Sequence, residues 1–185
     1  EIRARLIYLF RSLKVDTIIS FNPWGHWEEN PDHYVTGQAV EAACWTGGMN
    51  KDYPEHFAAG LEPHTVWEKY LWIARGGQLY NRVVEITQVL NEKVASLAVN
   101  KSQGPGGSKG SQLKAQLAAQ GLRLPELGDD DETADREYCR LFLLDDEKEI
   151  GEQYGLAYAE PFYYIGRPGP SKVEAYVEQH AVSNT

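Results

Sequence analysis

The sequence has few of the features that mark several classes of protein. Its only cysteines, Cys44 and Cys139, lie far apart in a chain of 185 residues. Two such residues exclude a disulfide scaffold and a cysteine-rich zinc site, and they are typical of a reducing compartment. Apolar runs are also short, and none reaches the roughly 18 residues that indicate a membrane-spanning helix. We therefore expect no membrane span.

Positive charge is scarce as well. The chain has 18 lysines and arginines against 27 aspartates and glutamates, so its formal net charge is -9. No basic stripe offsets this charge, which argues against a nucleic-acid partner and against binding to an anionic membrane surface. Hydrophobic residues make up 42% of the chain, which is a globular composition. We expect residues 1–185 to form a single domain with a sizeable core.

Methionine is nearly absent, and the chain does not begin with one. Met49 is the only methionine, and residues 1–13 already carry apolar side chains at helical spacing. A chain that starts inside a helix predicts that upstream sequence is missing, and any signal peptide would be missing with it. A cytoplasmic location is the expectation that remains, and the oligomeric state is left open.

The first fifty residues alternate between helical and strand-like patterns. After the helix at 1–13, residues 15–21 are mostly apolar and β-branched, which predicts a strand buried on both faces of a parallel sheet. Residues 34–45 predict a second helix, which Asp32 would cap and the following glycine pair would end. Helix, strand, loop and helix with short connections indicate an α/β sheet.

The rest of the chain continues this alternation. Strands are predicted at 65–73, 83–86 and 156–165, and helices at 87–100, 111–120 and 145–154. Residues 50–63 predict a loop, Thr87 and Thr133 predict helix N-caps, and the chain ends in a predicted polar tail. Residues 104–132 open on a glycine-rich run that lacks the Gly-Lys-Ser/Thr ending of a phosphate-binding loop, so we interpret them as a flexible insert.

The loop at 22–33 is the richest segment, and it follows the first predicted strand. It holds two of the five histidines, three acidic residues and two tryptophans. Ligands of open α/β sheets bind at this end of the strands, in pockets that set polar groups among apolar walls. Taken alone, Asp32-His33 is more often a helix cap followed by a surface histidine. Its setting favours a site, because a neighbouring carboxylate is the usual way to present an imidazole to a metal ion.

The same loop resembles a known family. Asn-Pro-Trp-Gly-His at 22–26, Asn-Pro-Asp-His-Tyr at 30–34 and Ala-Val-Glu-Ala-Ala at 39–43 are similar to the second signature of the PIG-L/LmbE zinc-dependent deacetylases. That signature has His-Pro-Asp-His ahead of a helix containing Ala-Val-x-x-Ala-Ala. Residues 84–103 resemble the family's Asp-Ile-Thr … Lys … Ala-Leu … Ser-Gln segment, and residues 155–162 resemble its Gly-x-x-Tyr-Ala-Glu-x-Phe. Three matches in the same order are far more specific than any one alone.

The resemblance implies a Rossmann-like, mostly parallel sheet flanked by helices, with the amino-terminal strands missing from this chain. It implies one catalytic zinc ion at the carboxyl ends of the strands and the removal of acetyl groups from N-acetylglucosamine-type amino sugars. Carried over to this sequence, His33 would be a zinc ligand and Asp32 would orient the catalytic groups. Trp24, Trp27 and Tyr34 are expected to form walls for the sugar ring.

This sequence departs from the family's pattern at two points. The signature His-Pro-Asp-Asp-Glu, which supplies the other zinc ligands and the general base in the family, is absent from it. We therefore expect the chain by itself to bind zinc weakly and to be inactive. Asn30 stands where the family has a histidine that stabilises the oxyanion. An amide can donate to an oxyanion, but we favour His26 for this role, because an imidazolium stabilises negative charge better.

The predicted function is thus zinc-dependent hydrolysis of the N-acetyl group on a small amino-sugar substrate. Two alternatives stay open. An amidase of the same family would cut a bulkier amide, whereas a non-catalytic module that has lost the metal would only bind a sugar or a partner. Comparing activity on acetylated sugars with activity on bulkier amides distinguishes the deacetylase from the amidase. The zinc content distinguishes either enzyme from the binding module.

Overall fold

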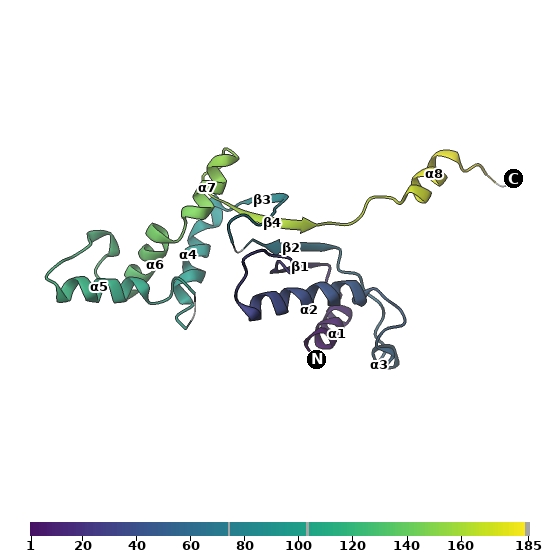
Figure 1. Ribbon diagram of the computed structural model, residues 1–185, viewed down its shortest axis with the longest axis horizontal. Coiled ribbons are helices and arrows are strands. Elements are labelled where there is room, and N and C mark those ends of the chain that lie inside the picture. The colour runs from purple at the N-terminus through teal and green to yellow at the C-terminus, as the bar shows by residue number, and fades with distance from the viewer. Residues whose placement is uncertain (74, 103, 184–185) are drawn as a thin grey trace. The chain divides into compact units, whose positions relative to one another are not determined.

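The chain contains both helices and strands, and its helices outnumber its strands (Figure 1). The computed structural model describes residues 1–73, 75–102 and 104–183. Contacts divide the chain into two compact units, Glu1–Arg82 with Phe162–Thr185 and Val83–Pro161. Helices flank a four-stranded sheet with the strand order β1-β2-β4-β3, which confirms the predicted α/β class. Across the described residues, no helix combines the length and the apolar character needed to cross a membrane.

The sheet of the first unit is mixed. The elements of this unit are α1 (Ile2–Leu13), β1 (Thr17–Phe21), α2 (Pro31–Gly47), α3 (Pro54–Ala58), β2 (Glu68–Trp72), the end of β4 (Ala159–Ile165) and α8 (Lys172–His180). β1 runs parallel to β2, with Phe21 opposite Trp72, and β2 runs antiparallel to β4, with Trp72 opposite Phe162. This register places three aromatic residues in one row across the sheet.

The core of the first unit lies between the two long helices and β1. Its buried residues come from α1, α2 and the approach to β2, and they are Ile7, Phe10, Val40, Ala43, Cys44 and Val66. Ile18 of β1 packs against this cluster, but Ile19 is 70% exposed. The prediction that this strand is buried on both faces is therefore wrong. β1 is the outer strand in the sheet order, and α1 and α2 contact it from one face only, so successive side chains alternate between core and solvent.

A buried arginine joins α1 to the end of α2. The Arg11 side chain is fully buried and donates to the carbonyl oxygens of Gly47 at 3.1 Å, Met49 at 2.7 Å and Asp52 at 3.0 Å. It also contacts His56 Nδ1 at 3.1 Å, and His56 belongs to α3. The predicted loop at 50–63 thus contains a short helix. Its start is favoured by a proline at the first helical position, where the missing N–H costs nothing.

The second unit is mostly helical. Its elements are β3 (Arg82–Glu85), η1 (Thr87–Val89), α4 (Leu90–Val99), α5 (Lys109–Ala119), η2 (Pro125–Leu127), α6 (Asp131–Phe142), α7 (Asp145–Gln153) and the start of β4. Val94 and Ala98 of α4 pack with Cys139 of α6 and with Leu144 in a small buried core. The unit therefore has an apolar centre of its own.

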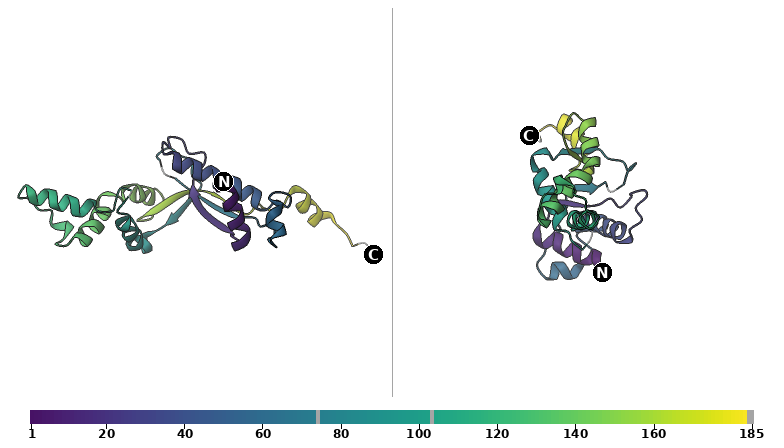
Figure 2. Two further views of the ribbon diagram at one scale, coloured as in Figure 1. Left: turned by 90° about the horizontal axis from the view of Figure 1, so that it is seen from below. Right: turned by 90° about the vertical axis from the view of Figure 1, so that its left-hand side faces the viewer.

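Residues 104–132, which we predicted as a flexible insert, include α5, and α5 lies beside α6 (Figure 2). Gly110 permits this close approach, because a β-carbon there would stand 1.8 Å from the Ala134 carbonyl oxygen. The N–H of Ser111 also donates to the buried carboxylate of Asp135 at 2.7 Å. A glycine contact and a buried polar contact thus anchor α5 to α6.

Two predicted helix caps and the predicted polar tail differ from the structure. Thr87 does not cap α4; it lies in η1, and its hydroxyl accepts from the Tyr158 N–H at 3.2 Å. Asp130, not Thr133, is the N-cap of α6, because the Asp130 carboxylate accepts from the Thr133 N–H at 2.8 Å. The predicted polar tail contains α8, whose capping box pairs Ser171 with Glu174.

Candidate functional site

The loop at 22–30 joins the carboxyl end of β1 to the start of α2, as the sequence predicts. Asn22 and Pro23 are buried, and the Asn22 side chain accepts from the Trp24 N–H at 2.9 Å, which turns the chain sharply after the strand. Gly37 lets α2 pass directly over this turn, since a β-carbon there would stand 2.8 Å from the Phe21 carbonyl oxygen. The first turn of α2 is therefore held against the end of β1.

Asn30, not Asp32, caps α2. Its side-chain oxygen accepts from the Asp32 N–H at 3.0 Å, and its backbone is extended with φ -78° and ψ 114°. Proline explains the difference, because Pro31 forces the residue before it into an extended conformation and itself starts the helix without needing an acceptor. The prediction of Asp32 as the cap is wrong by two residues, and Asp32 lies in the first turn.

His33 is held by three neighbours in this first turn. The Phe21 ring stacks on its imidazole, with ring centres 4.1 Å apart and planes 10° from parallel. Its Nε2 lies 3.2 Å from the side-chain nitrogen of Asn30. Its Nδ1 is buried and lies 3.2 Å from Glu28 Oε1, but out of line for a well-formed hydrogen bond. Both ring nitrogens thus have a defined neighbour, and neither faces open solvent alone.

Glu28 is the carboxylate next to His33. Its side chain is only 4% exposed, and Oε1 accepts from the Asn30 N–H at 3.0 Å and from Arg75 at 3.4 Å. Burial by itself raises the pKa of Glu28, but the Asn30 N–H, His33 and Arg75 outweigh this and hold the pKa below its usual value. Glu28 is therefore a buried, ionised carboxylate at the start of α2, where the helix dipole also favours negative charge.

Sequence reasoning assigned the carboxylate neighbour of His33 to Asp32 and overlooked Glu28. Asp32 is exposed, and among the described residues no hydrogen bond or ion pair joins its carboxylate to His33. The spacing of Asn30 and His33 was the available signal. These residues occupy the N-cap and the third helical position, the two positions that a capping box brings into contact. A carboxylate just before such a cap lies within reach of the same histidine.

The other predicted site residues line the loop without meeting His33. The His26 ring is exposed, and only its backbone carbonyl is bound, by Gln78 at 2.9 Å. Trp27 is 80% exposed and has a positive φ of 65°. Trp24 and Tyr34 are partly exposed, and the Trp24 ring meets Tyr163 edge-on at 5.8 Å. The structure thus brings Asn30 to His33 and leaves His26 and the two tryptophans on the surface around them.

An aromatic stack extends from His33 across the sheet. Phe21 lies between His33 and Trp72, and its ring centre is 5.4 Å from that of Trp72 with planes 16° apart. Trp72, at the end of β2, is half exposed. The sequence alone does not place Trp72 beside this loop, because the pairing of Phe21 with Trp72 depends on strand register. The stack makes Trp72 part of the surface next to His33.

His33 and Glu28 fit one part of a zinc site. Within the described residues, no group of three or more His, Cys, Asp or Glu side chains could hold a metal ion. A catalytic zinc typically has three protein ligands. His33 offers an imidazole, and Glu28 is the only acidic side chain in ion-pair contact with it among those residues. The described residues therefore do not form a complete zinc centre.

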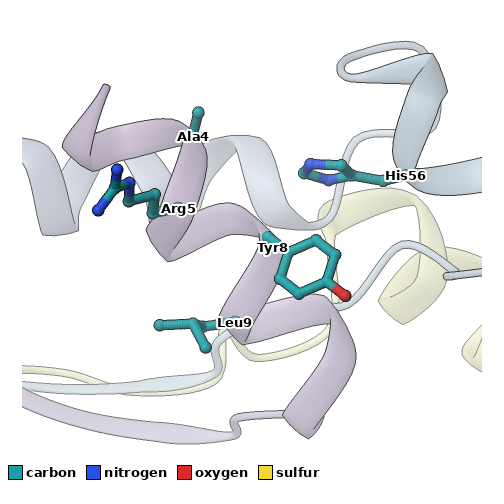
Figure 3. A pocket seen from close by; sticks show the side chains of 5 residues that line it. All are labelled: Ala4, Arg5, Tyr8, Leu9 and His56. Carbon is teal, nitrogen blue, oxygen red and sulfur yellow. The ribbon is translucent and has the colours of Figure 1, made fainter. Parts of the chain in front are cut away.

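A separate pocket of about 470 Å³ lies on α1 and α3. Figure 3 shows Arg5, Tyr8 and Leu9 projecting from α1, with His56 facing them from α3. His56 is buried between Tyr8 and Tyr53, and it contacts the Arg11 guanidinium. None of the predicted site residues lines this pocket. Its histidine, His56, is a core residue.

The two later segments that resemble the family meet in an ion-pair cluster. Lys93 of α4 lies 2.5 Å from Glu160 of β4 and 2.8 Å from Glu147 of α7. Its side chain is 21% exposed. Gln103, at the end of the first of these segments, lies outside the described residues. The Lys93 cluster ties three elements of the second unit together and contains no residue that we predicted for the site.

Comparison with known proteins relates the chain to deacetylases. No model of a known protein family matches it. It is 26% identical over 106 residues to diacetylchitobiose deacetylase from Thermococcus kodakarensis, a match that covers 57% of this chain and 38% of that protein. The structure of N,N'-diacetylchitobiose deacetylase from Pyrococcus horikoshii matches 100% of this chain and 55% of that one, with a TM-score of 0.63 at 20% identity. The chain has the fold of this deacetylase.

The same fold occurs in proteins with other names. A conserved protein from Thermus thermophilus matches 92% of the chain and 59% of its own length, with a TM-score of 0.54 at 20% identity. The 4-carboxy-2-hydroxymuconate hydratase of Pseudomonas putida matches 92% of the chain and 60% of its own length, with a TM-score of 0.54 at 14% identity. A fold shared by a deacetylase and a hydratase does not determine the reaction. The low-identity sequence match is what supports a deacetylase family, and the chain spans only 38% of that relative.

Proposed function

We propose that this chain carries part of the active site of an N-deacetylase that hydrolyses the acetamide of an N-acetylglucosamine-type sugar. The observation that carries the proposal is the His33 imidazole, held by Phe21, Glu28 and Asn30 at the carboxyl end of β1. It occurs in a chain with sequence similarity to diacetylchitobiose deacetylase. The strand end is where ligands of open α/β sheets bind, which agrees with this role.

In this proposal His33 is one ligand of a zinc ion. When bound, zinc would polarise the acetamide carbonyl and acidify water. Hydrolysis joins a water oxygen to the carbonyl carbon, breaks the C–N bond and passes a proton to the departing amine. The described residues provide neither a set of three ligands nor a base next to His33 other than Glu28, which is already engaged by Arg75 and Asn30. We therefore expect these 185 residues by themselves to release no acetate.

The oxyanion donor in this proposal is His26 rather than Asn30. Both polar atoms of the Asn30 side chain are engaged, the oxygen in capping α2 and the nitrogen at His33. The His26 imidazole is exposed on the same loop and makes no hydrogen bond or ion pair within the described residues. An imidazole N–H there is available to donate to a developing oxyanion. Turnover should therefore fall more in His26→Ala than in Asn30→Ala.

Exposed aromatic side chains around His33 would bind the sugar. Trp24, Trp27 and Tyr34 are all more than a third exposed, although large aromatic side chains are normally covered. Such rings combine an apolar face with a polar edge, which suits a sugar ring that has both. Asp32, exposed beside them, keeps its proposed role in orienting the catalytic groups.

A non-catalytic sugar-binding module is the second candidate. The lack of a three-residue metal-ligand group in the described chain favours it. An amidase of the same kind is a third candidate and differs only in its acyl group. All three share the aromatic surface and differ in the chemistry that follows binding.

The deciding experiment measures acetate release, zinc content and ligand binding on the protein at its full natural length, whatever that adds to these 185 residues. N,N'-diacetylchitobiose is the substrate, and His33→Ala is the inactive control. Stoichiometric zinc with acetate release that depends on His33 would support the proposal. Quenching of tryptophan fluorescence by the sugar, with no zinc and no acetate, would identify the binding module. Release of a bulkier acyl group, but not of acetate, would identify the amidase.

A further inference from the structure

We infer that Asn30 and Glu28 together fix the tautomer of His33, with the proton on Nδ1 and the lone pair on Nε2. In this assignment both are positioning residues, and Nε2 is the atom that His33 presents to a metal ion or to a proton donor. Only this use of Nε2 rests on the proposed function. The tautomer itself follows from hydrogen bonding within the first turn of α2.

The helix cap fixes the orientation of the Asn30 amide. Its oxygen and nitrogen differ in hydrogen bonding, because the oxygen only accepts and the nitrogen only donates. The Asp32 backbone N–H, a donor, lies 3.0 Å from the Asn30 oxygen. Turning the amide over would place two donors against each other and would remove the cap from α2. The cap therefore directs the amide nitrogen toward His33.

The Asn30 amide contacts the Nε2 atom of the His33 ring. Asn30 Nδ2 lies 3.2 Å from His33 Nε2. Since the amide nitrogen can only donate, Nε2 must accept, and an accepting imidazole nitrogen carries no proton. A neutral imidazole has one N–H, so the proton is on Nδ1. The helix cap thus determines the tautomer of the histidine three residues later.

Glu28 supports the same assignment from the other side of the ring. Its Oε1 lies 3.2 Å from the buried Nδ1, and a carboxylate oxygen accepts but does not donate. The Nδ1–H is out of line with Oε1, so the contact acts mainly through charge. Asn30 and Arg75 fix the carboxylate at 3.0 and 3.4 Å, so it remains beside Nδ1. An acceptor at Nδ1 and a donor at Nε2 favour one and the same tautomer.

The Phe21 stack holds the ring in this plane. Turning the imidazole over in its plane of stacking would place carbon atoms against both Glu28 and Asn30 and would lose both polar contacts. The Asn30 nitrogen also covers the lone pair, so any ligand of Nε2 must replace it. Asn30 is therefore a temporary partner of the histidine as well as the cap of α2.

Nitrogen-15 NMR of the histidine side chains tests this inference directly. The spectrum is recorded at about pH 8, well above the ordinary histidine pKa of about 6.5. His33 is assigned by its absence from His33→Ala. We expect a pyrrole-like Nδ1 and a pyridine-like Nε2, which is the opposite of the tautomer that free histidine favours in water. A protonated Nε2, alone or together with Nδ1, would overturn the inference.

Two variants separate the contributions of Asn30 and Glu28. Asn30→Asp keeps an oxygen for the cap but replaces the amide donor with an acceptor, so Nε2 should become protonated. Glu28→Gln should lower the population of the Nδ1–H form. Glu29→Gln removes the same charge from the exposed neighbouring residue and should leave the His33 signals unchanged.

The variant spectra also have clear adverse outcomes. An unchanged tautomer in Asn30→Asp would contradict the role of Asn30, and equal spectra for Glu28→Gln and Glu29→Gln would contradict that of Glu28. Circular dichroism and the dispersion of amide signals check that each variant is folded. The spectra do not depend on turnover, so this inference and the proposed function can fail separately. A protein that releases no acetate but has the expected tautomer would contradict the proposed function alone. An active protein with the other tautomer would contradict this inference alone.

Discussion

The two ends of α2 each hold a buried charged side chain, but the two charges have different surroundings. At the carboxyl end, Arg11 is surrounded by the carbonyl oxygens of Gly47, Met49 and Asp52. At the amino end, Glu28 lies beside the His33 Nδ1, which has no well-formed hydrogen bond. Each charge has the sign that the helix dipole favours at its end. The difference lies in how completely the polar atoms are satisfied.

This contrast separates stability from function. The Arg11 donors meet backbone carbonyls and the His56 ring, so the guanidinium has nothing left to offer a ligand. Removing it leaves those carbonyls buried without a partner. At the amino end, the His33 lone pair is covered only by a neutral amide that a stronger ligand can replace. We expect substitutions at the carboxyl end to affect folding and substitutions at the amino end to affect chemistry.

The largest expected effect is that of Arg11→Met. The methionine leaves several carbonyl oxygens without donors, so the free energy of unfolding should fall by about 3–5 kcal/mol. Urea denaturation measures this change. Arg3→Met, on the exposed side of the same helix, is the matched control and should cost less than about 0.5 kcal/mol. Equal costs for the two variants would remove the structural role that we give to Arg11.

Asn30→Ala should have the next largest effect on stability. Loss of an asparagine N-cap costs about 1 kcal/mol, measured by the same urea titration. Asn30→Asp keeps the cap and should stay close to the wild-type stability while changing the His33 tautomer. The pair therefore separates the two functions of one side chain. If both variants were equally destabilised, the contact with His33 rather than the cap would account for the cost.

The sequence predicted much of this arrangement and missed the part that depends on contacts across loops. Periodicity located α1, β1 and α2, and the family resemblance directed attention to Asn30 and His33. The cap is Asn30 and not the predicted Asp32, because Pro31 forces the residue before it into an extended conformation. The neighbours Trp72 and Arg75 come from a distant segment of the sequence, and only the pairing of β1 with β2 brings them near. No local pattern encodes that register.

The pH dependence of stability should reveal Glu28. Because its pKa is lower in the folded chain, the ionised carboxylate stabilises the fold above the usual carboxyl range, and this contribution is lost as the pH falls through the folded pKa. Wild type should therefore lose more free energy of unfolding than Glu28→Gln between about pH 6 and about pH 3. Glu29→Gln controls for the change in net charge. The same loss in wild type and in Glu28→Gln would mean that the carboxylate is not held as described.

Asp32→Asn should have the smallest effect, and it tests sequence reasoning against structure. Asp32 is exposed and has no side-chain partner among the described residues, so only its favourable position in the first turn of α2 is lost, at about 0.3–1 kcal/mol. The His33 nitrogen spectrum should not change. A spectrum that changed in Asp32→Asn but not in Glu28→Gln would return the carboxylate partner of His33 to Asp32, as the family resemblance implies. The comparison of the two ends of α2 would then lose its buried anion, and the amino end would be only an exposed cap next to a histidine.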